Sequence, residues 1–192
     1  MTLPNKITVG RILLIPVFAL VAWKYGISFA TGFPDERLRL AATGIFIVAA
    51  ASDCLDGYAA RRFNQRTRLG TILDPVADKL LVATAILSIA FGGWPDAFPV
   101  WFVLIVIGRD LLLAVGFLML CRLKRAVTVR PNLIGKLATL LQMTAILWVL
   151  IGIRAISAIH LIVPAAIFTS ASGISYFIDG VRQTRHAEQR RL

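Results

Sequence analysis

The chain has 192 residues, of which 58% are hydrophobic and 16% are charged, and its formal net charge is +11. A soluble domain usually carries about a quarter charged residues, and a disordered chain is poor in large apolar residues, so both classes are excluded. Two cysteines in unrelated contexts do not support a disulfide-stapled secreted fold. The composition therefore predicts a small membrane protein.

Six apolar stretches are long enough to cross a bilayer as helices, which takes about 20 residues each. In chain order they are residues 7–23, 38–60, 71–91, 98–121, 133–153 and 156–178. The first stretch lacks the small-residue cleavage pattern of a signal peptide, so we expect it to remain as a span. We therefore predict one all-α integral membrane domain over residues 1–192, built as a six-transmembrane-helix bundle.

The basic residues are distributed unevenly over the two sides of the predicted bundle. With the N-terminus inside, 15 of the 21 basic residues fall on the inner side. The other six are Lys24, Arg37, Arg39 and Arg154 outside, and Lys79 and Arg109 within spans. The positive-inside rule then places both termini in the cytoplasm. Such a basic rim suits anionic lipid headgroups or an anionic substrate, although it could also serve topology alone, and we expect no nucleic-acid partner.

Four aspartates lie in the second and third predicted spans, where a charged side chain costs about 2.5 kcal/mol or more at the helix centre. Asp53 and Asp56 are three residues apart, and Asp74 and Asp78 are four apart. Each pair therefore shares a helix face, and a short cytoplasmic turn containing Gly70 brings both pairs to one end of a hairpin. Converging carboxylates need a cation between them, and Mg²⁺ or Mn²⁺ fits their oxygens best, with Ca²⁺ fitting less well. No His or Cys lies at zinc-ligand spacing around them, which disfavours Zn²⁺.

Some of these aspartates also have structural explanations when they are considered singly. Asp74 could cap a helix that begins at Pro75, and Asp78 could form an intramembrane ion pair with neighbouring Lys79 or with Arg109. A regular array of four is harder to explain in this way, so we favour a metal site.

Small and basic residues accompany the first acidic pair. Gly57 and Ala60 leave space on the same helix for a flat or phosphorylated ligand, although small residues also serve helix packing in membranes. Arg61 follows Gly57 by one turn and is suitably placed to bind phosphate oxygens in a bidentate manner.

The complete pattern is Asp53-x2-Asp56-Gly57-x2-Ala60-Arg61-x8-Gly70-x3-Asp74-x3-Asp78. It resembles the signature of the CDP-alcohol phosphatidyltransferase family at every fixed position. The family's N-terminal element is similar to the opening Pro4-Asn5-Lys6-Ile7-Thr8-x2-Arg11. The resemblance implies an enzyme of phospholipid biosynthesis that transfers a phosphatidyl group from CDP-diacylglycerol to an alcohol and releases CMP.

The resemblance also implies roles for individual residues. Two divalent metal ions, Mg²⁺ or Mn²⁺, would be bound by Asp53, Asp56, Asp74 and Asp78. Asp78 would also be the general base that takes the proton from the acceptor hydroxyl. The CDP moiety would be held by Gly57, Ala60, Arg61, Thr8 and Arg11. The implied protein is a homodimer in the bacterial cytoplasmic membrane, with its active site on the cytoplasmic side.

Two acceptor alcohols fit the sequence. The cationic residues available for a phosphorylated acceptor are Arg109, Arg122, Arg130 and Lys136. The segment around Lys136 resembles that of phosphatidylglycerophosphate synthases, which use glycerol 3-phosphate, although those enzymes often have Arg-Glu where this chain has Arg109-Asp110. The latter stretch also resembles the cardiolipin synthases of the family, which use phosphatidylglycerol. We expect glycerol 3-phosphate, because several cations suit a small phosphate monoester.

A divalent-cation transporter is the alternative from another functional class, because carboxylates at membrane level could also move an ion. The chain shows no inverted repeat and no pair of broken spans in matching halves, and its aspartates lie near the predicted cytoplasmic end rather than at the midplane. The sequence therefore favours the transferase.

Overall fold

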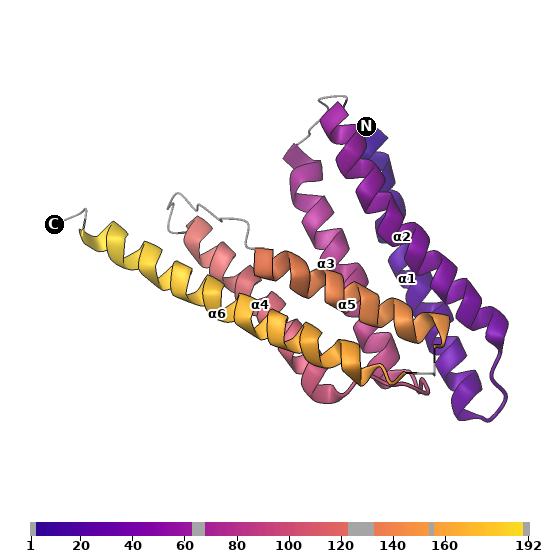
Figure 1. Ribbon diagram of the computed structural model, residues 1–192. Helices are drawn as coiled ribbons and strands as arrows, with labels where there is room; N and C mark the ends of the chain where they lie inside the picture. Colours follow the sequence, from indigo (N-terminus) through magenta and orange to yellow (C-terminus); the bar gives the residue numbers. More distant parts are fainter. Residues whose placement is uncertain (1–2, 63–67, 123–132, 154–155, 190–192) are drawn as a thin grey trace. The chain divides into compact units, whose positions relative to one another are not determined.

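The computed structural model describes the chain over residues 3–62, 68–122, 133–153 and 156–189, with side chains over 8–52, 73–116, 133–153 and 156–178. This part of the chain is all-helical (Figure 1). Its helices are α1 (Leu3–Ala30), α2 (Glu36–Arg62), α3 (Arg68–Phe91), α4 (Val100–Arg122), α5 (Leu133–Ile151) and α6 (Ile159–Gln189). Each of them overlaps one predicted span, so the predicted all-α class is confirmed.

Three segments of the described chain are long and apolar enough to cross a membrane, namely Thr8–Ala30, Leu133–Ile151 and Ile159–Ile178. In α3, the charged residues Asp74, Asp78 and Lys79 interrupt the apolar stretch. The bundle of six transmembrane helices therefore stays a prediction for α2, α3 and α4.

The helices divide into two compact units, and each is described by itself. The first unit comprises Met1–Pro99 and Ile146–Ser157, and the second comprises Val100–Ala145 and Ala158–Leu192. The boundary falls within α5, so that one continuous helix contributes residues to both units. The assignment of residues 1–192 to one domain stays a prediction.

In the first unit, α1 packs against both α2 and α3, and α2 also contacts α3 (Figure 1). Alternating intervals of three and four residues keep side chains on one face of a helix. The buried face of α1 follows this rule with Thr8, Arg11, Ile15, Phe18, Ala22 and Tyr25. Phe18 meets Phe46 of α2 with a distance of 5.8 Å between ring centroids. The buried face of α1 is therefore polar at its N-terminal end, at Thr8 and Arg11, and mostly apolar from Ile15 onward.

Glycine allows a close backbone approach near the end of α1. A Cβ atom on Gly26 would overlap the carbonyl oxygen of Gly92, which follows α3. Beside this contact, the indole Nε1 of Trp94 donates a hydrogen bond of 3.2 Å to the carbonyl oxygen of Ala22. The Trp94 ring also meets Tyr25 edge-on, with centroids 4.5 Å apart. The segment after α3 is thus anchored directly on α1.

We expect Gly26→Ala to lower the melting temperature of the detergent-purified protein by several degrees. The added methyl group overlaps the Gly92 carbonyl, and overpacking of this kind typically costs about 1–3 kcal/mol. The matched control is Gly44→Ala in α2, where a Cβ atom meets nothing within 4 Å and alanine is the better helix former. Thermal unfolding followed by intrinsic fluorescence compares the two, and equal melting temperatures would argue against the close contact.

Arg39 of α2 closes the C-terminal end of α5. Its Nη1 donates to the carbonyl oxygen of Leu150 at 3.4 Å and also to that of Ile151. Its Nε forms a 2.5 Å ion pair with Glu36. The next residue after α5, Gly152, has a φ of 80°, and a side chain there would overlap the guanidinium. Carbonyl groups that the helix itself leaves unpaired are thus satisfied by a cation.

In the second unit, α4 packs against α6. Buried apolar residues of this unit include Phe102 and Val106 of α4 and Ala165 of α6. The Nε2 of Gln142 on α5 donates a hydrogen bond of 2.7 Å to Thr169 Oγ1 on α6, within the buried region. A polar link therefore joins two apolar helices, a common device between helices in lipid.

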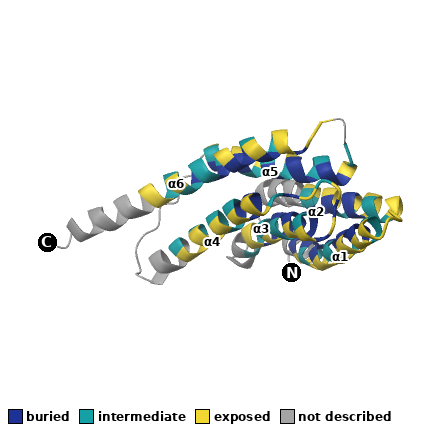
Figure 2. Cartoon of the chain, turned by 90° about the horizontal axis from the view of Figure 1, so that it is seen from below, coloured by how far each residue is buried: buried dark blue, intermediate teal, exposed yellow. Residues whose placement is uncertain are grey.

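Exposed residues occur along the helices of both units (Figure 2). Many of them are large and apolar. Those with more than 60% of their surface exposed include Leu13 and Leu20 of α1, Leu104 of α4, and Ile167 and Ile174 of α6. Apolar surface of this extent is unfavourable in water and favourable against hydrocarbon, so it supports contact with lipid.

Candidate functional site

The backbone of α2 carries the first half of the predicted site. The residues of this half stand at positions i, i+3, i+4, i+7 and i+8, which a helix places on one face. They are Asp53, Asp56, Gly57, Ala60 and Arg61. Their side chains lie outside the described residues, and their convergence on a ligand stays a prediction.

Asp74 and Asp78 lie within α3, one turn apart. Because α3 begins at Arg68, Asp74 does not cap a helix that starts at Pro75, and that structural alternative is wrong. The expectation that Gly70 belongs to the turn is also wrong, since the helix already includes it. Glycine weakens a helix by about 1 kcal/mol without ending it, and the helix continues although Pro75 cannot donate its backbone hydrogen bond.

Two side chains of α1 contact the aspartates of α3. Thr8 Oγ1 donates a 2.6 Å hydrogen bond to Asp74 Oδ1, and Arg11 Nη1 forms a 2.5 Å ion pair with Asp78 Oδ1. Arg11 Nε also donates to Ser52 Oγ at 3.1 Å. Ser52 directly precedes Asp53 on α2, so Arg11 joins the acidic regions of both helices. The structural alternative for Asp78 named Lys79 or Arg109 as its ion-pair partner, and the structure shows an ion pair with Arg11.

The burial of these groups is unequal. The side chain of Arg11 is fully buried, with 0% exposed, whereas 40% of the Asp78 side chain is exposed. Thr8 is also buried, and Asp74 is partly exposed. The donors on α1 are therefore enclosed in the protein, while the carboxylates that they contact remain accessible.

The carboxylates of α3 suit a hard divalent cation by their chemistry. Their oxygens are the ligands that Mg²⁺ and Mn²⁺ prefer, and they are accessible and held by hydrogen bonds from α1. Within the described side chains, no three of the His, Cys, Asp and Glu residues gather closely enough to hold a metal. Since Asp53 and Asp56 lie outside that set, the site of four carboxylates stays a prediction.

A second polar cluster surrounds Arg109 on α4. Its Nη1 forms a 2.7 Å ion pair with Asp110, and its Nη2 donates a 2.8 Å hydrogen bond to Ser172 Oγ on α6. The guanidinium carbon lies 5.8 Å from the ring centroid of Tyr176. Only 8% of the Arg109 side chain is exposed, and its Nε is buried without a hydrogen-bond partner. A guanidinium has five N–H groups, so this one has donors beyond those that bind Asp110 and Ser172.

Glycines from two helices leave space for the Arg109 side chain. A Cβ atom on Gly135 of α5 would lie 3.2 Å from Arg109 Nη2, and one on Gly173 of α6 would lie 3.3 Å from Arg109 Cγ. Ser172 and Tyr176 were not predicted from the sequence as part of a site. The sequence feature that could have identified them is their spacing, since both are polar and lie one turn apart in an apolar span.

Of the other three predicted acceptor residues, only Lys136 has a side chain among the described residues. Lys136 is exposed on α5, next to Gly135. Arg122 is the last residue of α4, and its side chain lies outside the described residues, as does the whole of Arg130.

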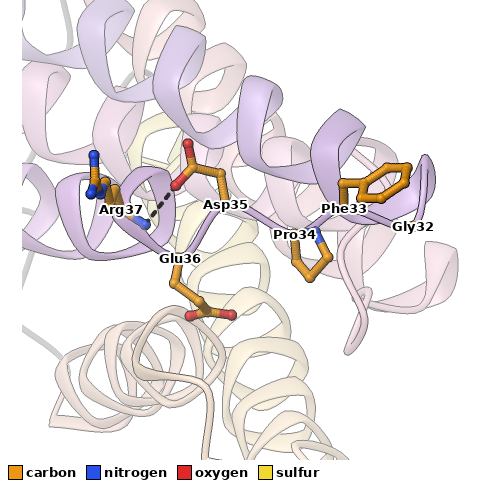
Figure 3. A pocket seen from close by; sticks show the side chains of 6 residues that line it. All are labelled: Gly32, Phe33, Pro34, Asp35, Glu36 and Arg37. Carbon is orange, nitrogen blue, oxygen red and sulfur yellow. Dashed lines mark hydrogen bonds between the residues drawn. The ribbon is translucent and has the colours of Figure 1, made fainter.

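A shallow cavity of about 560 Å³ lies at the turn between α1 and α2 (Figure 3). It is lined by residues 32–37, among which Asp35 Oδ1 accepts a 3.0 Å hydrogen bond from the backbone N–H of Arg37. This is the hydrogen bond of a helix N-cap, here at the start of α2. The turn follows the end of α1 opposite to Thr8 and Arg11, so this cavity is not part of the candidate site.

Comparison with known proteins decides the family. The family model of the CDP-alcohol phosphatidyltransferases matches residues 1–180. The chain belongs to the CDP-alcohol phosphatidyltransferase family. The predicted family and enzyme class, a transferase of phosphatidyl groups, are therefore confirmed. Since this family is membrane-bound, and the described chain has three long apolar helices, the protein is a membrane protein.

Two bacterial proteins are similar to this chain over about three quarters of its length. It is 38% identical over 148 residues to the CDP-diacylglycerol–glycerol-3-phosphate 3-phosphatidyltransferase of Bacillus subtilis (strain 168), covering 75% of this chain and 74% of the relative. It is 36% identical over 152 residues to the protein of the same name from Escherichia coli (strain K12), covering 77% of this chain and 76% of the relative.

Proposed function

We propose that this enzyme transfers the phosphatidyl group of CDP-diacylglycerol to glycerol 3-phosphate, which gives phosphatidylglycerophosphate and CMP in phospholipid biosynthesis. The two relatives named for this reaction support the choice of acceptor. The observation in the structure that carries the choice is the Arg109 cluster, because a buried guanidinium whose Nε has no hydrogen-bond partner suits a small phosphate monoester.

The proposed reaction exchanges one bond at phosphorus. The acceptor oxygen forms a bond to the phosphorus that carries diacylglycerol, and the bond from that phosphorus to the bridging oxygen breaks. CMP leaves with the electron pair. We assign the hydroxyl proton to Asp78, whose accessible carboxylate is the general base of this proposal.

The remaining site residues are proposed to bind and orient the donor. Asp53, Asp56, Asp74 and Asp78 would hold two divalent ions, Mg²⁺ or Mn²⁺, in keeping with the general metal dependence of the family. Bound ions would neutralise the pyrophosphate charge and favour the departure of CMP. Gly57, Ala60 and Arg61 are proposed to hold the CDP moiety. Placing acidic pairs on two helices would preorganise the site better than loops could.

We extend the proposal to the membrane arrangement. All six described helices would cross the bacterial cytoplasmic membrane, with both termini and the aspartates on the cytoplasmic side. The supporting observations are the 15 of 21 basic residues on that side and the exposed apolar side chains of the helices. A homodimer is proposed on the resemblance alone.

An acceptor panel tests the proposed reaction. Purified protein is incubated with CDP-diacylglycerol, Mg²⁺ or Mn²⁺ and one alcohol at a time, and lipid products and CMP are identified by mass spectrometry. We expect phosphatidylglycerophosphate from glycerol 3-phosphate and no product from phosphatidylglycerol. Cardiolipin from phosphatidylglycerol would replace the proposed acceptor. If no alcohol releases CMP and the protein instead carries Mn²⁺ into liposomes, the chain is a cation transporter.

Lys136→Ala is expected to raise the KM for glycerol 3-phosphate about 3- to 10-fold, because an exposed cation contributes on the order of 1 kcal/mol to a phosphate contact. The KM for CDP-diacylglycerol should stay unchanged. The matched control, Lys24→Ala, removes another exposed lysine from the predicted outer end of α1. Steady-state kinetics with both variants decide the point, and an unchanged acceptor KM for Lys136→Ala removes this lysine from the acceptor site.

A further inference from the structure

The polar end of α1 contacts both carboxylates of α3 in register. Thr8 and Arg11 are three residues apart on one helix, and Asp74 and Asp78 are four apart on the other. Each donor on α1 therefore meets one carboxylate, with donor–acceptor distances of 2.6 and 2.5 Å. Two contacts of this kind fix the rotation of α1 about its own axis relative to α3.

The burial of the donors argues against a direct contact with a nucleotide. The Arg11 side chain is fully enclosed, and its guanidinium contacts Asp78 and Ser52. A nucleotide could contact the guanidinium only after this ion pair had opened. Opening would leave a buried cation without its anionic partner, which is strongly unfavourable. Thr8 is similarly enclosed, with 1% of its surface exposed.

The effect on the carboxylates follows from ordinary hydrogen-bond geometry. A donor bound to one carboxylate oxygen restricts the rotation of the group and so fixes the direction of both oxygens. Arg11 also offsets one of the negative charges on α3, which reduces the repulsion between Asp74 and Asp78. Thr8 supplies orientation without charge.

We propose that Thr8 and Arg11 are positioning residues that orient Asp74 and Asp78 for divalent-cation binding, and that they do not contact CDP. This inference rests on the proposed function, since it assigns the α3 carboxylates to the metal site. It replaces the nucleotide contact that the resemblance implies for Thr8 and Arg11. It also gives α1 a role in the chemistry although this helix carries no acidic residue.

The experiment uses Thr8→Val, which removes the hydroxyl group at nearly constant volume, and Thr8→Ser, which keeps it. Mn²⁺ binding to the detergent-purified full chain is measured by electron paramagnetic resonance without nucleotide or lipid. Kinetics are then measured at saturating Mn²⁺. We expect Thr8→Val to weaken Mn²⁺ binding about 10-fold or more and to lower kcat, while the KM for CDP-diacylglycerol stays within about 2-fold. Thr8→Ser should restore both quantities.

A second variant tests the ion pair. Arg11→Lys keeps the charge but loses the planar fork that reaches both Asp78 and Ser52, so it should weaken Mn²⁺ binding and leave the KM for CDP-diacylglycerol unchanged. The positioning role is overturned if Thr8→Val or Arg11→Lys raises the donor KM while Mn²⁺ binding stays at the wild-type level. That outcome would assign these residues to the nucleotide.

Failure of this inference can be distinguished from failure of the proposed function. The Mn²⁺ measurement contains no acceptor, so a different acceptor alcohol would not alter it. Wild-type protein that makes phosphatidylglycerophosphate, together with variants whose Mn²⁺ affinity is unchanged, rejects the positioning role alone. Wild-type protein that binds no Mn²⁺ rejects the metal assignment on which both proposals depend.

Discussion

Asp78→Asn is expected to lower the turnover number by about 10²- to 10⁴-fold, the usual contribution of a general base, while CDP-diacylglycerol still binds. Asparagine has the size of aspartate but cannot take up the proton of the acceptor hydroxyl. Its amide oxygen can still accept the hydrogen bond that Arg11 donates to Asp78, so the fold should be retained. Turnover is measured as CMP release at saturating Mn²⁺, and donor binding is measured separately with radiolabelled lipid.

The control for this substitution is Asp96→Asn, which removes the same charge from the same unit after the other end of α3. We expect wild-type turnover from it. Wild-type turnover from Asp78→Asn would exclude the role of Asp78 as base. A loss of donor binding equal to the loss of turnover would instead assign Asp78 to substrate binding.

Arg109→Lys should raise the KM for glycerol 3-phosphate by about 10- to 150-fold, the loss expected when charge-assisted hydrogen bonds worth about 1.5–3 kcal/mol are removed. Lysine keeps the positive charge beside Asp110, but it cannot also reach Ser172 and a phosphate with a planar fork. The KM for CDP-diacylglycerol should not change.

Arg39→Lys is the matched control, because it makes the same exchange at an arginine that binds Glu36 and the end of α5 in the first unit. It should affect thermal stability and not the acceptor KM. Equal acceptor KM values for Arg109→Lys and the wild type would remove Arg109 from the acceptor site.

Helices were predictable from the sequence because long apolar stretches have few alternatives in lipid. Their ends were less predictable, because hydropathy falls at the first polar residue while backbone hydrogen bonding continues. The predicted last span stops at Ile178, whereas α6 continues to Gln189 through a polar tail. In the same way, the glycine signal at Gly70 suggested a turn where α3 had already begun.

The site was predictable only within single helices. Spacing places Asp74 and Asp78 on one face of α3, and α3 confirms that they lie one turn apart. The contacts of Thr8 and Arg11 with these aspartates depend on how α1 is rotated against α3, and no spacing within one helix contains that information. Ser172 was missed because serines in an apolar span commonly serve packing, and Ser170 and Ser175 lie in the same span.

The buried stripe of α1 has a consequence for substitutions far from the aspartates. Gly26 follows Thr8 by 18 residues, which is five whole turns at 3.6 residues per turn, so both project from the same side of the helix. The tight contact of Gly26 with Gly92 therefore sets the rotational phase at which Thr8 and Arg11 face α3. One residue inserted midway along α1 would turn its two ends by about 100° relative to each other. The carboxylates would then lose their donors although every residue of the site was still present.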